Sequence, residues 1–251
     1  MSDPGHVRLI PIKGLPEVVA GTDLGEILVA QFAFQNGDVL VLAQKIVSKA
    51  EGRLIDLRLV EPGEEARRLA LASEKDPRLV QVILNESRRV VRVRPGLIIV
   101  EDNRGWVCAN AGIDRSNTGQ SEGSETVCLL PVDPDASASD LRSRLRVSSG
   151  VTVGVLIIDS HGRAWREGTV GVTIGASGLK VLDDRRGQPD RQGYILEHTV
   201  VGTADEIAAA ASLLMGEADE GVPAIVVRGL DVQGAGNAAQ LQRPAEMDLF
   251  R

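Results

Sequence analysis

Two short segments of the sequence carry side chains that could hold a divalent cation. Asp159 and Ser160 directly follow the apolar run VTVGVLII, and a carboxylate at the end of a buried strand faces the crevice where ligands collect. Asp114 lies in CANAGIDRSNTGQSEG, whose small and polar residues can present N–H groups and oxygens to a metal or phosphate. The alternatives are a strand-ending Asx turn at Asp159 and an ordinary surface loop around Asp114.

A third acidic group and two lysines extend this pattern. Glu217, Asp219 and Glu220 lie in MGEADEGV, at the C-terminal end of a predicted helix, where the helix dipole disfavours negative charge. A bound cation would compensate for that charge, and a solvated acidic cap is the alternative. Lys45 and Lys49 in QKIVSKAEGR follow a buried strand. Lysines beside an oxygen-ligand metal site would suit a triphosphate, although lone lysines are most often surface charges.

Other catalytic schemes find little support in the sequence. No Walker A motif is present, and the glycine-rich stretch from Gly234 to Ala239 lies too close to the C-terminus for the βαβ unit of a dinucleotide site. His6, His161 and His198 belong to no HExxH motif, and the sequence has no GxSxG elbow. A hydrolase triad is therefore disfavoured.

Composition excludes several classes of protein. The 251 residues include 28 Lys and Arg against 35 Asp and Glu, for a net charge of −7, and few aromatic residues. Nucleic-acid binding is disfavoured, because it needs clustered positive charge or stacking platforms. Cys108 and Cys128 fit no zinc or redox spacing. Because no secretory signal or membrane-length apolar run is seen, we expect a cytoplasmic protein with no membrane partner.

The elements that would position these residues are mixed. Apolar runs predict strands at 7–12, 39–42, 151–158 and 222–227, and an antiparallel meander at 88–109. Helical patterns cover 23–34, 61–73, 76–87, 139–147 and 204–216, whereas 162–178 is glycine-rich and 184–193 reads as a polar loop. Residues 131–139 resemble a linker or a loop before a helix. We therefore predict an α+β fold with mixed or antiparallel sheets, as one unit over 1–251 with a substructure boundary near 131–139.

The order of these segments resembles one enzyme family over essentially the whole chain, from about residue 9 onward. The segments IPIKGLPEV, LAQKIVSKAEGR, ANAGIDRSN, LIIDSHGRAWREG, ADEIAAAASLLMGEADEGVP and RPAEMDLFR resemble the coenzyme F420-0:L-glutamate ligase family. The resemblance implies a homodimer with an α+β fold that is neither P-loop nor ATP-grasp. It implies that GTP converts the terminal carboxylate of the deazaflavin F420-0 to an acyl phosphate, which L-glutamate then attacks. Mg²⁺ or Mn²⁺, with two divalent ions bound, and K⁺ are the implied cofactors.

The resemblance also implies roles for individual residues. The metal contacts fall on Asp114, Asp159, Ser160 and Glu217, of which Asp114 and Asp159 are the catalytic pair. The implied nucleotide contacts are Leu9, Ile10, Pro11, Ile12, Gln44, Lys45, Lys49, Asn117, Met215, Gly216, Ala218, Asp219, Glu220, Gly221 and Val222.

Three positions depart from the family's pattern. Ser160 replaces a Thr and keeps a hydroxyl, Glu217 replaces a Gln in MGQ, and Gln44-Lys45 replaces a Ser-Thr pair. The alternative function is a nucleotide- or deazaflavin-binding module without ligase activity.

Overall fold

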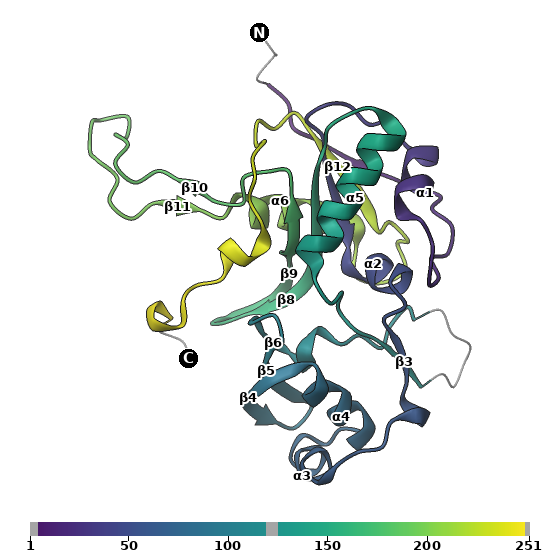
Figure 1. Cartoon of the computed structure of the whole chain (residues 1–251). Helices are drawn as coiled ribbons and strands as arrows, with labels where there is room; N and C mark the ends of the chain where they lie inside the picture. Colours follow the sequence, from purple (N-terminus) through teal and green to yellow (C-terminus); the bar gives the residue numbers. More distant parts are fainter. Residues whose placement is uncertain (1–4, 119–124, 249–251) are drawn as a thin grey trace.

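A five-stranded sheet forms the centre of the molecule (Figure 1). The structure is a computed structural model that describes residues 5–118 and 125–248. The strand order is β1-β12-β2-β8-β9, with bounds Arg8–Pro11, Ala224–Arg228, Val39–Ala43, Gly154–Arg163 and Arg166–Ser177. β2 and β8 run parallel, and the other neighbours run antiparallel. The predicted α+β class with mixed sheets is confirmed.

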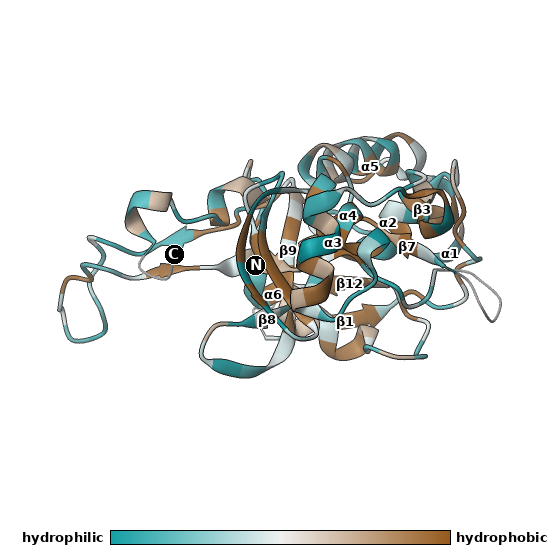
Figure 2. Ribbon diagram, turned by 90° about the horizontal axis from the view of Figure 1, so that it is seen from below, coloured by the Kyte–Doolittle hydropathy of each residue, from teal (hydrophilic) through white to brown (hydrophobic). Residues whose placement is uncertain are grey.

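Helices cover both faces of this sheet. Along β2, Leu40 and Leu42 belong to one buried core with α1 (Leu24–Gln31) and α5 (Pro134–Ser149). Val39 and Val41 point the opposite way, into a second core with α6 (Thr203–Met215). A strand buried on both faces reads as a continuous apolar run, which is why residues 39–42 were recognisable. Brown, apolar segments accordingly gather where the sheet meets α6 (Figure 2).

A smaller lobe, formed by the described residues between 54 and 129, lies beside the sheet and has its own apolar core. It contains the β3–β7 pair (Leu54–Asp56 and Thr126–Cys128), the helices α3 (Glu64–Ser73) and α4 (Pro77–Asn85), and the meander β4-β5-β6 (Ser87–Arg94, Leu97–Asp102 and Val107–Ala109). The predicted antiparallel meander is confirmed. Both helices begin later than predicted. Asp76 caps α4 by accepting a hydrogen bond from the N–H of Arg78, and Pro77 follows it in the first turn.

The helix predicted at 139–147 begins five residues earlier, at Pro134. Asp133 is its N-cap and accepts a hydrogen bond from the N–H of Ala136 at 3.0 Å. This Asp-Pro start is the same signal that marks α4, so the prediction of a linker or loop up to residue 139 was wrong.

The glycine-rich region 162–178 is mostly the edge strand β9 rather than irregular chain. A Cβ built at Gly171 would lie 2.7 Å from the carbonyl oxygen of Ala208 in α6, and one at Gly175 would overlap the carbonyl of Pro134 in α5. These glycines therefore let two helices approach the strand closely on either side.

Three other segments complete the fold. The unassigned segment after β2 forms the short helix α2 (Gln44–Ala50). The predicted polar loop lies on an extended arm whose base pairs β10 (Asp183–Asp184) with β11 (Val200–Val201) (Figure 1). After α6 and β12, the chain forms the short helix η3 (Ala238–Leu241), which contacts β9. No helix in the described ranges is both long and apolar enough to cross a membrane.

Because α5 packs closely against β9, a methyl group added at Gly175 should destabilise the fold more than one added at Gly162. We expect Gly175→Ala to lower the free energy of unfolding by about 1–3 kcal/mol, because the new Cβ overlaps backbone that cannot rotate away. Gly162→Ala is the matched control, since its Cβ would meet no atom within 4 Å. Urea unfolding of both variants measures the difference. Equal stability of the two would show that α5 does not pack against β9 in this way.

Candidate functional site

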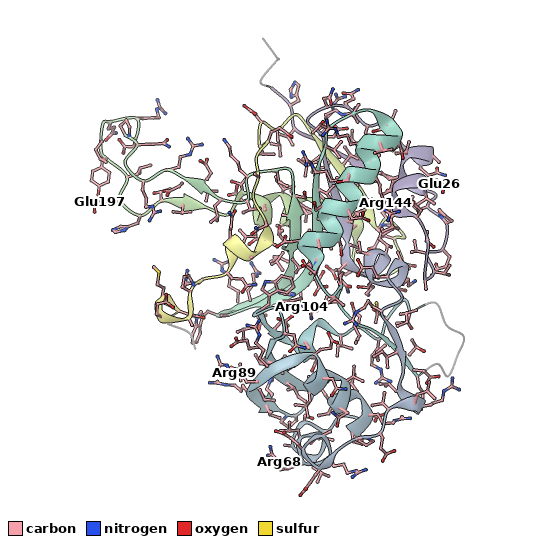
Figure 3. All side chains as sticks on the ribbon, viewed as in Figure 1. Glu26, Arg68, Arg89, Arg104, Arg144 and Glu197 are labelled. Atoms are coloured by element: carbon pink, nitrogen blue, oxygen red, sulfur yellow. The ribbon has the colours of Figure 1, made fainter. Side chains whose placement is uncertain are left out.

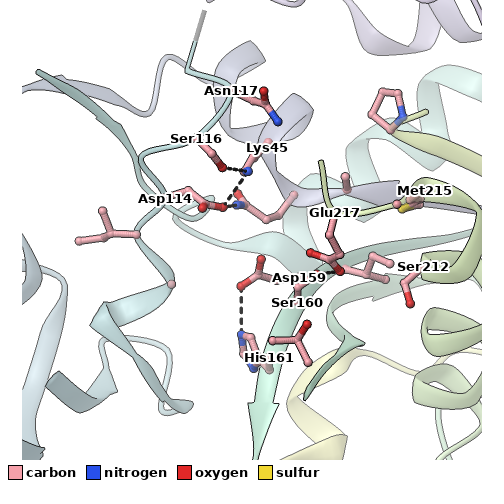
Figure 4. Close-up of a pocket in the computed structure, with 18 of the residues that line it drawn as sticks. Lys45, Asp114, Ser116, Asn117, Asp159, Ser160, His161, Ser212, Met215 and Glu217 are labelled. Carbon is pink, nitrogen blue, oxygen red and sulfur yellow. Dashed lines mark hydrogen bonds and ion pairs between the residues drawn. The ribbon is translucent and has the colours of Figure 1, made fainter. Parts of the chain in front are cut away.

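A cleft of about 1860 Å³ lies between the central sheet and the small lobe. It gathers the predicted site residues of four separate segments, and Figure 4 shows how several of them point toward one another. Those lining the cleft are Gln44, Lys45, Lys49, Asp114, Asn117, Asp159, Ser160 and all of residues 215–222.

Sheet topology explains why three of these segments meet. Because β2 and β8 are parallel, Ala43 pairs with Ile158, and the first residues of α2 leave the sheet at the edge where Asp159 and Ser160 continue along β8. β12 runs the other way beside β2, so the loop that precedes it arrives at that same edge. The N–H of Ala43 donates to the carbonyl of Pro223 at 2.9 Å and fixes this junction.

An unusual turn positions Asp114. Asn110 and Ala111 adopt left-handed φ values of 51° and 56°, and Gly112 follows at 67°. A Cβ at Gly112 would lie 2.8 Å from Cγ of Leu130, so only glycine fits there. Such conformations are strained for residues other than glycine and concentrate at functional sites. Beyond the turn, Asp114 and Cys128 exchange two backbone hydrogen bonds of 2.9 and 2.8 Å, which hold the Asp114 backbone in place.

The carboxylate of Asp114 is held by the first two residues of α2. Nζ of Lys45 lies 3.2 Å from Oδ2, and Nε2 of Gln44 donates to the same oxygen at 3.4 Å. Gln44 is itself held by Ser48, whose hydroxyl donates to Oε1 of Gln44 at 2.8 Å. Gln44 and Lys45 thus take part in the site directly, although they replace the Ser-Thr pair of the resembling family.

The electrostatic environment of Asp114 is unfavourable to its charge. Burial raises the pKa of this carboxyl above its usual value, Lys45 opposes the rise, and the charges of Asp159 and Glu217 add to it. Burial and the charges of two carboxylates across the cleft therefore act together on Asp114, and Lys45 opposes them.

Asp159 and Ser160 point to opposite sides of β8, because side chains alternate along a strand. The strand continues to Arg163, and Asp159 pairs with Val172, so the strand-ending Asx turn proposed as an alternative is wrong. Oδ2 of Asp159 lies 3.1 Å from Nε2 of His161, two residues along the same face. The hydroxyl of Ser160 donates to Oε1 of Glu217 at 2.6 Å, and this bond joins β8 to the loop after α6.

The acidic loop after α6 is stabilised largely by its own groups. The carboxylate of Glu220 accepts a hydrogen bond from the N–H of Ala218 at 2.9 Å, which lowers the pKa of Glu220. Gly216 has a φ of 71° and lies against this carboxylate. Nδ2 of Asn117 donates to the carbonyl of Ala218 at 3.3 Å and links the loop to the small lobe. The carboxylate of Glu220 therefore stabilises the loop itself, whereas the carboxylate of Glu217 binds the hydroxyl of Ser160.

The donor chemistry fits a hard divalent cation. Asp114, Asp159, Glu217 and the hydroxyl of Ser160 are all oxygen donors, the type that Mg²⁺ and Mn²⁺ prefer. Their charges are incompletely compensated, since two of these carboxylates raise the pKa of the third. Within the described ranges, no three His, Cys, Asp or Glu side chains are grouped closely enough to hold a metal ion as they stand.

One predicted segment lies away from the cleft. Leu9, Ile10, Pro11 and Ile12 lie in or just after the edge strand β1, and the structure does not place them among the residues that line the cleft. The following segment does line it, and Glu17 accepts an ion pair from Nζ of Lys49 at 2.6 Å.

Sequence reasoning missed two participants. Glu17 follows no spacing rule, and its ion pair with Lys49 spans 32 residues. Gln44 was among the implied nucleotide contacts, although its hydrogen bond to Asp114 spans 70 residues. His161 was set aside for lack of a motif, although an Asp-x-His alternation on one strand places both side chains on one face.

Cys108 and Cys128 are buried and free, and burial raises their pKa values to about 12 and about 11, as expected for unreactive thiols.

Comparison with known proteins places the chain among glutamate ligases. The sequence model of the family described as F420-0:Gamma-glutamyl ligase matches residues 13–229. A protein of Methanopyrus kandleri named Coenzyme F420:L-glutamate ligase is 47% identical over 250 residues, which cover 98% of each chain. Proteins with the same name from Methanothermobacter thermautotrophicus and Archaeoglobus fulgidus are 44% and 45% identical, covering 98% of this chain and 99% and 97% of theirs.

The raised pKa of Asp114 predicts a pH-dependent cost to the fold. A carboxyl whose pKa is raised by folding destabilises the protein once it ionises, so this cost appears as the pH rises from about 4 through the raised pKa. Relative to wild type, Asp114→Asn should therefore gain stability as the pH rises from 4 to 7. Urea unfolding of both proteins across this range tests the expectation. A relative loss of stability with rising pH would show that Lys45 outweighs burial.

Proposed function

Because this chain belongs to the F420-0:gamma-glutamyl ligase family, we propose that it catalyses the GTP-dependent addition of L-glutamate to coenzyme F420-0, followed by further γ-linked glutamates. The observation that supports this best is the convergence of Asp114, Asp159 and Glu217 with Lys45 and Lys49 on one cleft. The sequence separates these residues widely, and a bare nucleotide- or deazaflavin-binding module would not need three metal-binding carboxylates.

The proposed reaction makes an unreactive carboxylate reactive. A carboxylate oxygen of F420-0 attacks the γ-phosphorus of GTP, the bond to the bridging oxygen breaks, and GDP leaves. The amine of L-glutamate then attacks the carbonyl carbon of the acyl phosphate. An amide forms, inorganic phosphate leaves with the electron pair of the broken C–O bond, and the nitrogen loses a proton.

The oxygen donors have a defined place in this scheme. Asp114, Asp159, Ser160 and Glu217 would hold the divalent ions, Mg²⁺ or Mn²⁺, which spread the negative charge of the phosphates when bound. Ser160 orients Glu217 through the 2.6 Å hydrogen bond between them, and Lys45 keeps Asp114 directed into the cleft.

Two lysines and an asparagine would contact the nucleotide. Lys45 is paired with Asp114 and Lys49 with Glu17. Each ammonium could transfer part of its interaction to phosphate oxygens, since lysine acts as a point charge without strict geometry. Asn117 and the loop it contacts at Ala218 border the same space. We propose K⁺ as a further ion of the reaction on the family resemblance alone.

We also propose that the protein acts as a homodimer. The β10–β11 arm, on which Glu197 is labelled, extends from the body of the molecule (Figure 3). The same arm carries Tyr194 and Ile195, which are 62% and 51% exposed. Large apolar side chains exposed together on a projecting segment mark interaction surfaces. A second copy of the chain is the partner that the family resemblance implies.

The central prediction concerns Asp159. Asp159→Asn should lower the rate of ligation by about a hundredfold or more, because a neutral amide binds a hard cation far more weakly than a carboxylate. The assay combines purified protein with F420-0, L-glutamate, Mn²⁺, K⁺ and GTP, and mass spectrometry counts the added glutamyl units. Parallel reactions omit the metal or replace GTP with ATP.

Asp140→Asn serves as the matched control. Asp140 is an exposed carboxylate on α5, paired with Arg144 on the same helix and remote from the cleft. It should ligate at the wild-type rate. Wild-type activity in Asp159→Asn would contradict the metal assignment. A folded wild-type protein that binds GDP without adding glutamate would favour the binding-module alternative.

The homodimer is tested at the arm. Tyr194→Asp should shift the mass measured by light scattering from dimer toward monomer, because a charge replaces an apolar contact. Arg191→Glu, three residues away in the arm, controls for a change of charge alone. A wild-type protein that is monomeric at all concentrations would refute the dimer itself.

A further inference from the structure

On β5 and β6, the cleft-facing side of the β4-β5-β6 sheet of the small lobe is apolar, whereas the residues of β4 that pair with Leu97 and Ile99 are Arg94 and Arg92. Along β5, Ile98 and Val100 are fully buried in the core of the lobe. Leu97 and Ile99 alternate with them, so they point the other way, and both line the cleft. Antiparallel sheets usually keep polar residues on a face that is open to water. An apolar face turned into an open cleft therefore indicates a ligand with an apolar surface.

The strand register assembles these residues into a platform. Ile99 pairs with Ala109, and the next pair on the same face places Val107 beside Glu101. Val107 is 41% exposed although it is a large apolar residue. We call Leu97, Ile99, Val107 and Ala109 the apolar platform. All four line the cleft, and none belongs to the predicted metal or nucleotide contacts.

One end of the platform carries a cation and leads to the site. Arg94 pairs with Leu97 across the β4–β5 turn and lines the cleft. It has no ion-pair partner in the ranges that the structure describes. The chain leaves β6 at Ala109 and reaches Asp114 through the left-handed turn, whose Asn110 accepts a hydrogen bond from the N–H of Ile98. Arg94 therefore lies at the platform end nearest this turn.

The platform is also close to Asp159. The charge of Asp159 contributes to the raised pKa of Cys108, which lies between Val107 and Ala109 on β6. The cleft, at about 1860 Å³, exceeds the roughly 300–1,000 Å³ of a site for one small molecule. A nucleotide beside Lys45 and Asp114 thus leaves room for a second large ligand.

We propose that the apolar platform binds the flat deazaflavin ring of the acceptor and that Arg94 binds its anionic phospholactyl end. This inference rests on the proposed function. The order of features along the platform fits the order of groups in the acceptor. The ring lies on Ile99 and Val107, the anion lies at Arg94, and the terminal carboxylate reaches the neighbourhood of Asp114 and Asp159.

Direct binding measurements test the platform without turnover. The intrinsic fluorescence of the deazaflavin, titrated with protein in the absence of GTP, gives the Kd for F420-0. Val107→Asp should raise this Kd by about tenfold or more, because a charge replaces apolar contact under the ring. The Kd for GDP with Mg²⁺ should stay within about twofold of wild type. Ala109→Glu is a second test on the same face should Val107→Asp fail to fold.

A pair of ligands tests the arginine. Arg94→Gln should raise the Kd for F420-0 about tenfold or more, because a charge-assisted interaction is lost. The deazaflavin nucleoside that lacks the phospholactyl group should bind both proteins equally. Arg146→Gln, an exposed arginine of α5 away from the cleft, should bind F420-0 as wild type does.

The results of these measurements distinguish a failure of this inference from a failure of the proposed function. If wild type ligates F420-0 and the platform and Arg94 variants bind it with unchanged Kd, the acceptor site lies elsewhere and the ligase function stands. Equal weakening of both ligands by Arg94→Gln would overturn the role of that arginine. A wild-type protein that neither binds nor ligates F420-0 would refute the proposed function and this inference with it.

Discussion

The parallel pairing of β2 with β8 is the constraint on which the site depends. It sets Ala43 beside Ile158, so that Gln44 and Lys45 leave one strand where Asp159 and Ser160 continue along the other. Antiparallel pairing of β12 with β2 then brings the acidic loop to the same edge. A slip of one residue in the β2–β8 register would turn each side chain to the other face and separate Asp159 from the small lobe. Burial on both faces of these strands specifies the register strongly.

This arrangement concentrates negative charge where water is partly excluded. The energetic cost of ionisation falls on Asp114, whose pKa is raised by burial and by two neighbouring carboxylates. The fold offsets this cost in part through Lys45, which pairs with Asp114 at 3.2 Å, and it fixes each acidic residue by further contacts. Asp114 is fixed by its bridge to Cys128, Asp159 by the ladder of β8 and β9, and Glu217 by the hydroxyl of Ser160. These contacts place the three carboxylates around one cleft, and a bound cation would have to draw them closer together, since they are not grouped tightly enough to hold it as they stand in the described ranges.

The sequence predicted the elements best where local signals were strong. Continuous apolar runs located β2, β8 and β12, and the Asp-Pro start of α4 was recognisable, whereas the same start at α5 was overlooked. The glycine-rich region 162–178 was given no element, because the glycines of β9 reflect the nearness of α5 and α6, which no local pattern records. For the site, carboxylates beside apolar runs were informative. Contacts such as Gln44 to Asp114 or Lys49 to Glu17 depend on long-range packing and were out of reach.

Two departures of this chain from the pattern that the resemblance implies, at Glu217 and at Lys45, change the charge of the cleft in opposite directions. The resemblance implies that Glu217 takes the place of a Gln, which adds a negative charge to the cleft. Lys45, in the pair that replaces Ser-Thr, adds a positive one and bonds to Asp114, the carboxyl whose pKa is raised by Glu217 among other causes. The two changes therefore offset each other, and the net charge that the cleft presents to a metal and a triphosphate is the same as with Gln and Thr. Either change alone would alter the net charge of the cleft. Both together preserve it and place the positive charge of Lys45 at the start of α2.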